Sequence, residues 1–229
     1  MKVAEALGRV RGQGRAALVG YLPAGFPTVP GGIAAIRAMI EAGVDVVEVG
    51  LPYSDPVMDG PVIQRASEAA LAGGAGLITP DLIPEEAGEW LAAADAHRLD
   101  RVFLVAPSST DQRIASTVAA CRGFVYAAAL MGVTGARDQL SQAAPELVAR
   151  LRATDRRLPV GVGLGVRDGA QAATIAGYAD AVIVGSALVN TLLAAPDEPA
   201  GREALSRLTA DLAAGVRQPG DRRPVSAPA

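Results

Sequence analysis

Lysine, histidine and cysteine are almost absent from this sequence of 229 residues. The only lysine, Lys2, lies at the N-terminus, so the chain has no buried lysine that could form a Schiff base. The single histidine, His97, excludes a metal site built on two or three histidines. The single cysteine, Cys121, excludes an internal disulfide and a cysteine-based zinc site. Any catalysis must therefore depend on carboxylates, hydroxyls and backbone groups.

The sequence also lacks an excess of positive charge and a long hydrophobic run. Its 21 basic residues are outnumbered by 24 acidic residues, which argues against nucleic acid as a partner. Charged residues interrupt the first 20 positions, so we expect neither a signal peptide nor a membrane span there. Half of the residues are hydrophobic, which is enough for the core of one domain. We expect a cytoplasmic protein that does not bind membranes.

Short apolar runs of strand length alternate along the chain with longer stretches of helical periodicity. The apolar runs are residues 16–22, 44–51, 75–78, 101–106, 123–129, 159–164 and 180–185. The helical stretches are residues 30–42, 60–72, 84–98, 111–120, 138–153, 168–178, 187–195 and 200–216. This alternation with short loops predicts parallel β–α units, and the continuous apolar runs indicate strands that are covered on both faces.

Two architectures fit this alternation, an open doubly wound sheet and a closed TIM-type (β/α)₈ barrel. An open sheet would usually carry its glycine-rich phosphate loop after the first strand. Residues 23–30, PAGFPTVP, lack that pattern. Glycines cluster instead after the last two strands, where such barrels often bind phosphate. The sequence favours a single TIM-type barrel domain over residues 1–216, followed by a disordered tail at residues 217–229.

The strand count falls short of a closed barrel, because only seven strands can be recognised and eight are needed. The shortfall lies between Gly60 and Ile78, where one helical stretch leads directly into the strand at 75–78. Three glycines mark this junction, at positions 73, 74 and 76. We therefore expect that the third barrel strand and its adjoining helices are missing from this chain.

Glu48 is the strongest catalytic candidate, because valines precede and follow it within a predicted strand. Burial of a carboxylate in such a strand is costly and raises its pKa toward neutrality, which suits a general acid or base. A structural glutamate bonded to nearby backbone is the alternative. The loop that follows contains Asp55 and Asp59. Each could cap a helix or form an Asx turn, but two carboxylates near one strand end favour a functional role for one of them.

Three further features lie at the ends of predicted strands. Tyr126 belongs to the run at 123–129, where a tyrosine is more often a core residue than a catalytic one. The loop after it places glycines on both sides of Thr134, a composition typical of a lid. Glycine-containing turns at 163–165 and 185–187 each precede a predicted helix. Their backbone N–H groups could bind phosphate, and tight turns without a ligand are the alternative.

Five segments, in this order, resemble the tryptophan synthase α subunit: VVEVGLPYSDPVMDGPVIQRA, GLITPDLIPEE, FVYAAALMGVTGAR, PVGVGLGVRD and ADAVIVGSALV. The likeness extends from about residue 3 to about residue 215. It implies a carbon–carbon lyase of tryptophan biosynthesis that cleaves indole-3-glycerol phosphate to indole and glyceraldehyde 3-phosphate without a metal or cofactor. It also implies an α₂β₂ complex with a β subunit, which would carry the pyridoxal phosphate.

The resemblance assigns a role to each matching residue. Glu48 corresponds to the carboxylate that moves protons between the glycerol hydroxyl and indole C3, and Asp59 to the one that holds the indole N–H. Tyr126 corresponds to a tyrosine beside the catalytic glutamate. The remaining implied residues are Thr134 in the lid, Gly135, Gly165, Gly185 and Ser186 at the phosphate, Tyr21 and Leu164 at the indole, and Asp55 in the loop that faces the β subunit.

The missing segment leaves alternatives open. In the family, the third strand supplies part of the indole pocket and contacts to the β subunit. If the natural chain carries residues that this sequence omits, ordinary activity is expected. A true deletion predicts weak or absent lyase activity, and one alternative is an impaired α-like barrel that binds a phosphate ligand and regulates a β-subunit partner. Another phosphate-sugar enzyme would need acid or base residues at other strand ends, which the sequence does not offer.

Overall fold

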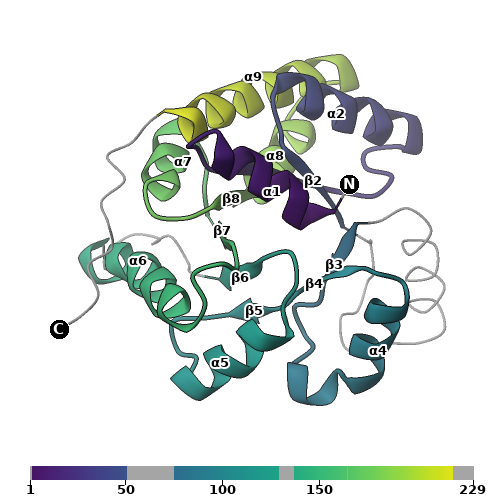
Figure 1. Cartoon of the computed structure of the whole chain (residues 1–229). Helices are drawn as coiled ribbons and strands as arrows, with labels where there is room; N and C mark the ends of the chain where they lie inside the picture. The colour runs from purple at the N-terminus through teal and green to yellow at the C-terminus, as the bar shows by residue number, and fades with distance from the viewer. Residues whose placement is uncertain (1, 51–74, 129–136, 164, 219–229) are drawn as a thin grey trace.

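The computed structural model describes residues 2–50, 75–128, 137–163 and 165–218. Its strands are β1 (Ala17–Pro23), β2 (Val46–Gly50), β3 (Gly76–Ile78), β4 (Asp100–Val102), β5 (Leu104–Val105), β6 (Val125–Ala128), β7 (Val160–Gly163) and β8 (Ala181–Val184). Its helices are α1 (Val3–Gly12), α2 (Val29–Ala42), α4 (Gly88–Ala96), α5 (Asp111–Ala120), α6 (Arg137–Thr154), α7 (Gly169–Ala176), α8 (Ser186–Leu193) and α9 (Glu198–Arg217), with a 3₁₀ turn η1 (Pro84–Glu86). Figure 1 shows strands at the centre and helices around them.

All strand pairs are parallel, as the apolar runs predicted. One sheet has the order β2-β1-β8-β7-β6-β5, and β3 pairs with β4 in a second sheet. The predicted strand at 101–106 contains both β4 and β5, which Phe103 separates. The described strands therefore form an arc that begins at β2 and ends at β3. The predicted TIM-type architecture with seven strand segments is confirmed, and the position between β2 and β3 is where the third strand was expected to be missing.

Helix boundaries follow local capping chemistry. Four helices begin after a threonine or aspartate whose side chain accepts the N–H three residues further on: Thr28, Thr110, Asp168 and Asp197. Such caps satisfy N–H groups that have no partner within the helix. Helix α2 ends at Gly43, whose φ of 113° is left-handed and favours glycine.

Helix α1 was not predicted from the sequence. It lies across one end of the ring of strands (Figure 1). Leu7 and Val10 are buried in α1 and belong to a cluster with inward-facing strand residues such as Val19 and Ile183. These two residues are buried only because the strand ends lie below them. The sequence of α1, which is short and contains charged residues, therefore gives little indication of this packing. The helix closes the end of the barrel at which the strands begin.

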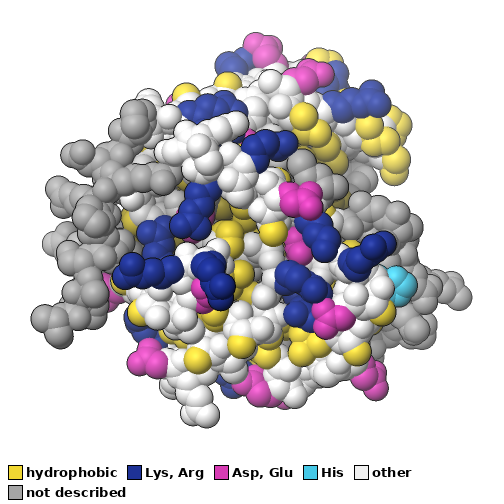
Figure 2. All heavy atoms as spheres, viewed as in Figure 1, with side chains coloured by type: hydrophobic (Ala, Val, Ile, Leu, Met, Phe, Trp, Pro, Cys, Tyr) yellow, Lys and Arg dark blue, Asp and Glu magenta, His cyan; other side chains and the backbone are white. Residues whose placement is uncertain are grey.

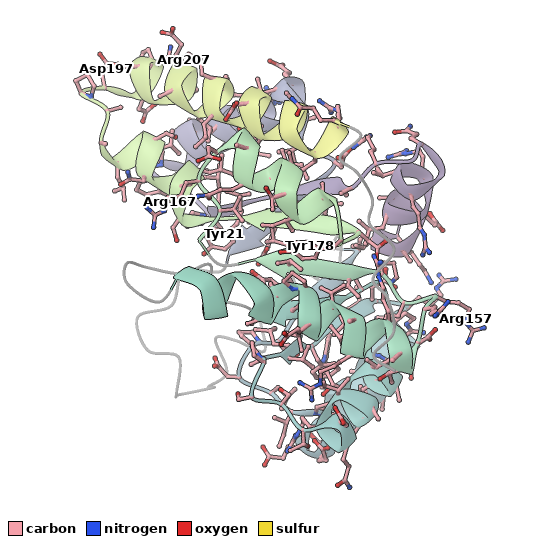
Figure 3. The ribbon with its side chains drawn as sticks, turned by 90° about the vertical axis from the view of Figure 1, so that its left-hand side faces the viewer. Tyr21, Arg157, Arg167, Tyr178, Asp197 and Arg207 are labelled. Atoms are coloured by element: carbon pink, nitrogen blue, oxygen red, sulfur yellow. The ribbon has the colours of Figure 1, made fainter. Side chains whose placement is uncertain are left out.

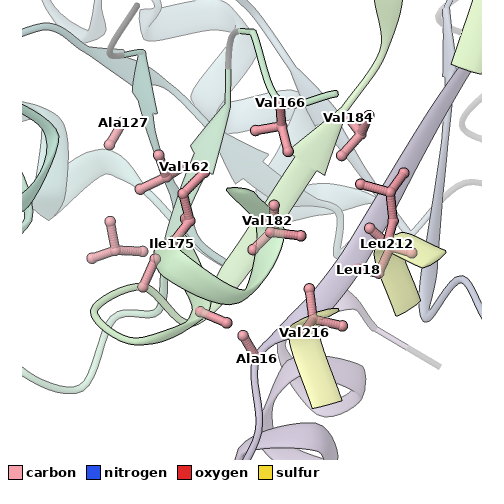
Figure 4. Close-up of a cluster of buried hydrophobic side chains, with 14 of the residues drawn as sticks. Ala16, Leu18, Ala127, Val162, Val166, Ile175, Val182, Val184, Leu212 and Val216 are labelled. Atoms are coloured by element: carbon pink, nitrogen blue, oxygen red, sulfur yellow. The ribbon is translucent and has the colours of Figure 1, made fainter. Parts of the chain in front are cut away.

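The outer faces of the strands carry the larger part of the core. Alternate strand residues point to opposite faces, so Leu18, Val162 and Val182 face the surrounding helices. They form one buried cluster with Ile175 of α7 and Leu212 of α9 (Figure 4). Residues of α2, α5, α6 and α8 extend the same cluster. This continuous shell holds the strands in place and leaves their inner faces to form the interior of the barrel.

Ion pairs tie the strand beginnings together. Arg15, just before β1, makes a bidentate pair with Asp45, just before β2, with both N–O distances at 2.7 Å. Asp95 of α4 pairs with Arg101 and with Arg122. Figure 2 shows basic and acidic side chains interspersed on the face that α1 crosses. The mixture of signs leaves no continuous basic surface in this view.

Helix α9 extends one residue beyond the predicted end of the domain, because Arg217, which was assigned to the disordered tail, is helical. Its last residue, Arg217, donates a hydrogen bond to the carbonyl of Gly43 at 2.9 Å, which joins the C-terminal ends of α9 and α2. Residues 219–229 of the predicted tail lie outside the described residues. None of the helices in the described part of the chain is long and apolar enough to cross a membrane.

Candidate active site

Tyr21, Glu48 and Tyr126 lie on the inner face of the barrel. Tyr21 of β1 is paired in register with Glu48 of β2, and the pair below them is Val19 and Val46. Val19 and Val46 belong to the inner cluster. Because side chains alternate along a strand, Tyr21 and Glu48 face the same interior, one layer nearer the carboxyl ends of the strands. In TIM-type barrels the active site is at those carboxyl ends.

Glu48 has an unusual protonation equilibrium. Burial raises its pKa from 4.5 to about 7, because water is lost from around the charged form. The carboxyl group is half-buried within a strand that is otherwise valine and glycine. Near neutral pH it is therefore present in both the acid and the base form, which a group that donates and accepts protons requires.

Tyr126 lies within electrostatic range of Glu48, although the two residues come from β6 and β2. The pKa of its phenol is raised by burial and, to a smaller extent, by the negative charge of Glu48. Its ring is 6.5 Å from the ring of Phe124, which lies in the inner cluster below it. The fold thus brings Tyr126 into the same part of the interior as Glu48, and the phenol stays protonated at neutral pH.

Each of the two tyrosines lies against a glycine on a neighbouring strand. A Cβ atom on Gly163 of β7 would lie 2.2 Å from the Tyr126 Oη atom. A Cβ atom on Gly50 of β2 would lie 2.1 Å from the Tyr21 Oη atom. Real Cβ contacts are essentially never shorter than 3.0 Å. Gly50 and Gly163 therefore provide the space in which the two rings lie.

The Tyr21 ring also approaches the turn after β8. A Cβ atom on Gly185 would lie 3.3 Å from its Cδ1 atom. Figure 3 shows Tyr21 toward the same end of the strands as Arg167, which follows β7, and away from Arg157, which precedes β7. The ring therefore lies toward the carboxyl ends of the strands, between β2 and the start of α8.

The two predicted phosphate turns differ in how their helices are capped. At the start of α7, Asp168 accepts the Gln171 N–H at 2.8 Å, so a carboxylate already occupies that helix end. At the start of α8 the cap is Gly185, which has no side chain, and Ser186 is the first helical residue. Gly165 has a φ of 93°, in the left-handed region that favours glycine. The beginning of α8 is therefore the better suited of the two helix ends to an anion.

Five predicted site residues lie outside the described residues: Asp55, Asp59, Thr134, Gly135 and Leu164. Of the others, the structure brings Tyr21, Glu48, Tyr126 and Gly185 to one region. The places of Gly50 and Gly163 beside the two tyrosine rings were not predicted. A glycine inside a strand of β-branched residues signals close approach of another group, and that pattern is present at both positions.

The geometry agrees with the comparison to known proteins. A model of the family described as "Tryptophan synthase alpha chain" matches residues 7–76 and 72–216. The chain belongs to the tryptophan synthase alpha chain family. The two matched ranges meet at residues 72–76, where the sequence predicted a missing segment.

Relatives in this family are close in sequence. The tryptophan synthase alpha chain of Salinispora arenicola is 58% identical over 261 aligned positions, covering 93% of this chain and 97% of that protein. That of Acidothermus cellulolyticus is 54% identical and covers 94% of this chain and 97% of that protein. The 261 aligned positions in the first comparison exceed the 229 residues of this chain by 32. At least that many positions in the alignment therefore face no residue here.

A solved structure confirms the fold. The structure of Mycobacterium tuberculosis tryptophan synthase superimposes with a TM-score of 0.77 at 51% identity. The match covers 94% of this chain and 98% of that chain. The architecture predicted from the apolar runs is thus that of the family, even though this chain is shorter than the relatives it matches.

Proposed function

We propose that this chain is the lyase subunit that cleaves indole-3-glycerol phosphate to indole and glyceraldehyde 3-phosphate. The observation that carries this proposal is the carboxyl group of Glu48, which faces the barrel interior beside Tyr21 and within range of Tyr126. Its pKa of about 7 suits proton transfer in both directions. The family of the chain supports the same reaction.

Glu48 moves the protons of a retro-aldol step. Its carboxylic acid form first gives a proton to indole C3, which places positive charge on the ring. The resulting carboxylate accepts the proton of the glycerol hydroxyl next to the ring as that carbon becomes the aldehyde of glyceraldehyde 3-phosphate. The bond between this carbon and C3 then breaks, and its electron pair neutralises the ring, which releases indole and leaves Glu48 protonated again. No metal or covalent intermediate is needed for this balance.

The other proposed residues bind and orient the substrate. Asp59 holds the indole N–H while positive charge develops on the ring, and Thr134 of the lid reaches back to Asp59. Tyr126 lines the site beside Glu48. Tyr21 and Leu164 flank the indole ring. The phosphate is held by backbone N–H groups of Gly135, Gly165, Gly185 and Ser186, with the beginning of α8 as the main anchor because its cap has no side chain.

The chain is further proposed to act in an α₂β₂ complex with a tryptophan synthase β subunit in the cytoplasm. Asp55 lies in the loop that would communicate with this partner, and pyridoxal phosphate would be bound by the partner. The similar structure from Mycobacterium tuberculosis is that of a tryptophan synthase, which supports an assembly of this kind.

The direct test measures indole release from indole-3-glycerol phosphate by the purified 229-residue chain and by its Glu48→Gln variant. General acid–base catalysis contributes about 10²- to 10⁴-fold, so we expect kcat/KM to fall by that factor in Glu48→Gln. Glu41→Gln is the matched control, because Glu41 is exposed on the outside of α2. Full activity in Glu48→Gln would refute the role of Glu48, and a wild-type chain that releases no indole would refute the function.

A further inference from the structure

We infer that Gly50 is a specificity-determining residue of the proposed indole site. It acts through Tyr21: because position 50 has no side chain, the Tyr21 ring can lie against β2, and the position of the ring sets the width of the pocket beside Glu48. This inference rests on the proposed function, since it takes the site to be one that binds an indole ring.

The strand register places the three residues on one surface. Tyr21 is opposite Glu48, and Gly50 is two residues further along β2, on the same inner face. A Cβ atom on Gly50 would lie 2.1 Å from the Oη atom of Tyr21 and 2.5 Å from its Cε2 and Cζ atoms. The phenol of Tyr21 therefore leans across β2 toward the carboxyl end of the strand and covers the position where a side chain at 50 would be.

The backbone at Gly50 does not itself require glycine. The glycines with a positive φ in the described residues are Gly14, Gly25, Gly43, Gly123 and Gly165, and Gly50 is not one of them. It has regular strand pairing with Pro23, and its carbonyl accepts the Ala24 N–H at 2.8 Å. Glycine is thus needed at position 50 because it has no side chain. The Tyr21 ring occupies the space that a side chain would fill.

The Tyr21 ring is also close to the turn after β8. On its other side, a Cβ atom on Gly185 would lie 3.3 Å from Cδ1 and 3.5 Å from the Cβ of Tyr21. The ring thus lies between β2 and the turn that begins α8. An alanine at position 50 would push the phenol away from β2 and into the interior, where the substrate is proposed to bind beside Glu48.

A double-mutant cycle tests this coupling. Gly50→Ala, Tyr21→Leu and the double variant are compared with the wild-type chain for kcat and KM of indole release. Misplacement of a substrate by about 1 Å can cost about 100-fold, so we expect Gly50→Ala to lower kcat/KM by about 10- to 100-fold. In the Tyr21→Leu background the same change should cost less than about 3-fold, because leucine lacks the ring atoms that reach Gly50.

The control variant is Gly88→Ala, because an added Cβ there meets nothing within 4 Å. It should leave kcat and KM unchanged. A second readout compares substrates that carry a methyl group on the benzene half of the indole with the unsubstituted substrate. Tyr21→Leu should shift the ratio of kcat/KM values toward the methylated substrates and Gly50→Ala should shift it away from them, and a purely structural role would leave this ratio unchanged.

Equilibrium dialysis of indole against the four proteins of the cycle separates this inference from the proposed function. Dialysis needs no turnover, so a wild-type chain that binds indole but releases none would refute the lyase function alone. The inference predicts that Gly50→Ala weakens indole binding only when Tyr21 is present. Equal losses of indole affinity in both backgrounds would overturn the inference. So would a coupling between the two positions that is visible only in urea unfolding, or a wild-type chain that binds no indole.

Discussion

The strands β7 and β8 are buried along their whole length, whereas β2 and β3 are partly exposed along theirs. Strand β7 pairs with β6 and β8, and β8 pairs with β7 and β1, while the described pairings of β2 and β3 are each on one side. The buried strands contain only valine, glycine, alanine and isoleucine. The catalytic candidate Glu48 lies on the partly exposed side.

This difference has a consequence for Glu48. A carboxylate in a fully buried strand would pay the whole cost of losing water, because no partner in such a strand compensates it. In β2 the cost is only partial, which leaves Glu48 with a pKa near neutrality and still able to ionise. The two sides of the barrel therefore differ: β7 and β8 are the more deeply buried strands, and β2 carries the proposed catalytic carboxyl group.

The largest effect on stability is expected on the buried side. Ile183 of β8 is 3% exposed and belongs to the inner cluster that α1 covers. Ile183→Ala should lower the free energy of unfolding by about 2–4 kcal/mol, through lost burial and the cavity left behind. Urea unfolding measures this value. A loss below about 1 kcal/mol would mean that the buried side is not the more stable one.

The pH dependence of stability should reveal Glu48 on the exposed side. Its pKa is raised from 4.5 to about 7 on folding, so the folded state binds more protons than the unfolded state between these values. This proton binding contributes to the free energy of unfolding. The contribution is fully present below pH 4.5 and is lost, by at most about 3 kcal/mol, as the pH rises through about 7. Glu48→Gln should remove this part of the dependence in urea unfolding between pH 5 and 8. An unchanged profile in the variant would contradict it.

A smaller effect is expected where β2 is anchored to β1. Asp45 is half-buried, and the loss of water by itself would raise its pKa, but the hydrogen bonds from Arg15 and from the Leu18 N–H and the charge of Arg15 lower the pKa overall. Asp45→Asn should therefore cost about 1–2 kcal/mol at pH 7. The contribution is present above the unfolded pKa near 3.8 and is lost as the pH falls below it, so wild type and variant should converge in acid unfolding. Arg15→Lys, which loses the bidentate geometry, serves as a comparison.

The smallest effect is expected at Val49, the residue next to Glu48 on the outer face of β2. Its side chain is 49% exposed. Val49→Ala should change the free energy of unfolding by less than about 0.5 kcal/mol, as is usual for surface positions. Measured beside Ile183→Ala, it gives the contrast between the two sides directly. A loss similar to that of Ile183→Ala would show that β2 is packed as firmly as β8.

Much of this fold could be predicted from local patterns. Apolar runs located all seven strand segments, because strands covered on both faces need continuous hydrophobic sequence. Helix α1 escaped prediction because Leu7 and Val10 become core residues only when the strand ends meet below them. The split of one predicted strand into β4 and β5 at Phe103 likewise has no signal in the run RVFLVA.

The candidate site was predictable in its residue types but not in its arrangement. Glu48 stood out because its neighbours are valines, and the family resemblance pointed to Tyr21 and Tyr126. The glycines that receive the two rings were not recognised as partners, because Tyr21 and Gly50 are far apart in sequence and meet only through the register of β1 and β2.

The sequence by itself narrowed the class of chemistry, since a chain with one lysine, one histidine and one cysteine was predicted to rely on carboxylates, hydroxyls and backbone groups. It also predicted the parallel barrel and a missing third strand between Gly60 and Ile78. Only the tertiary structure decided that Glu48 is half-buried with a pKa near 7, that Tyr126 reaches its electrostatic field, and that Gly50 makes room for Tyr21. Burial and register are properties of strands brought together, so no single segment carries them.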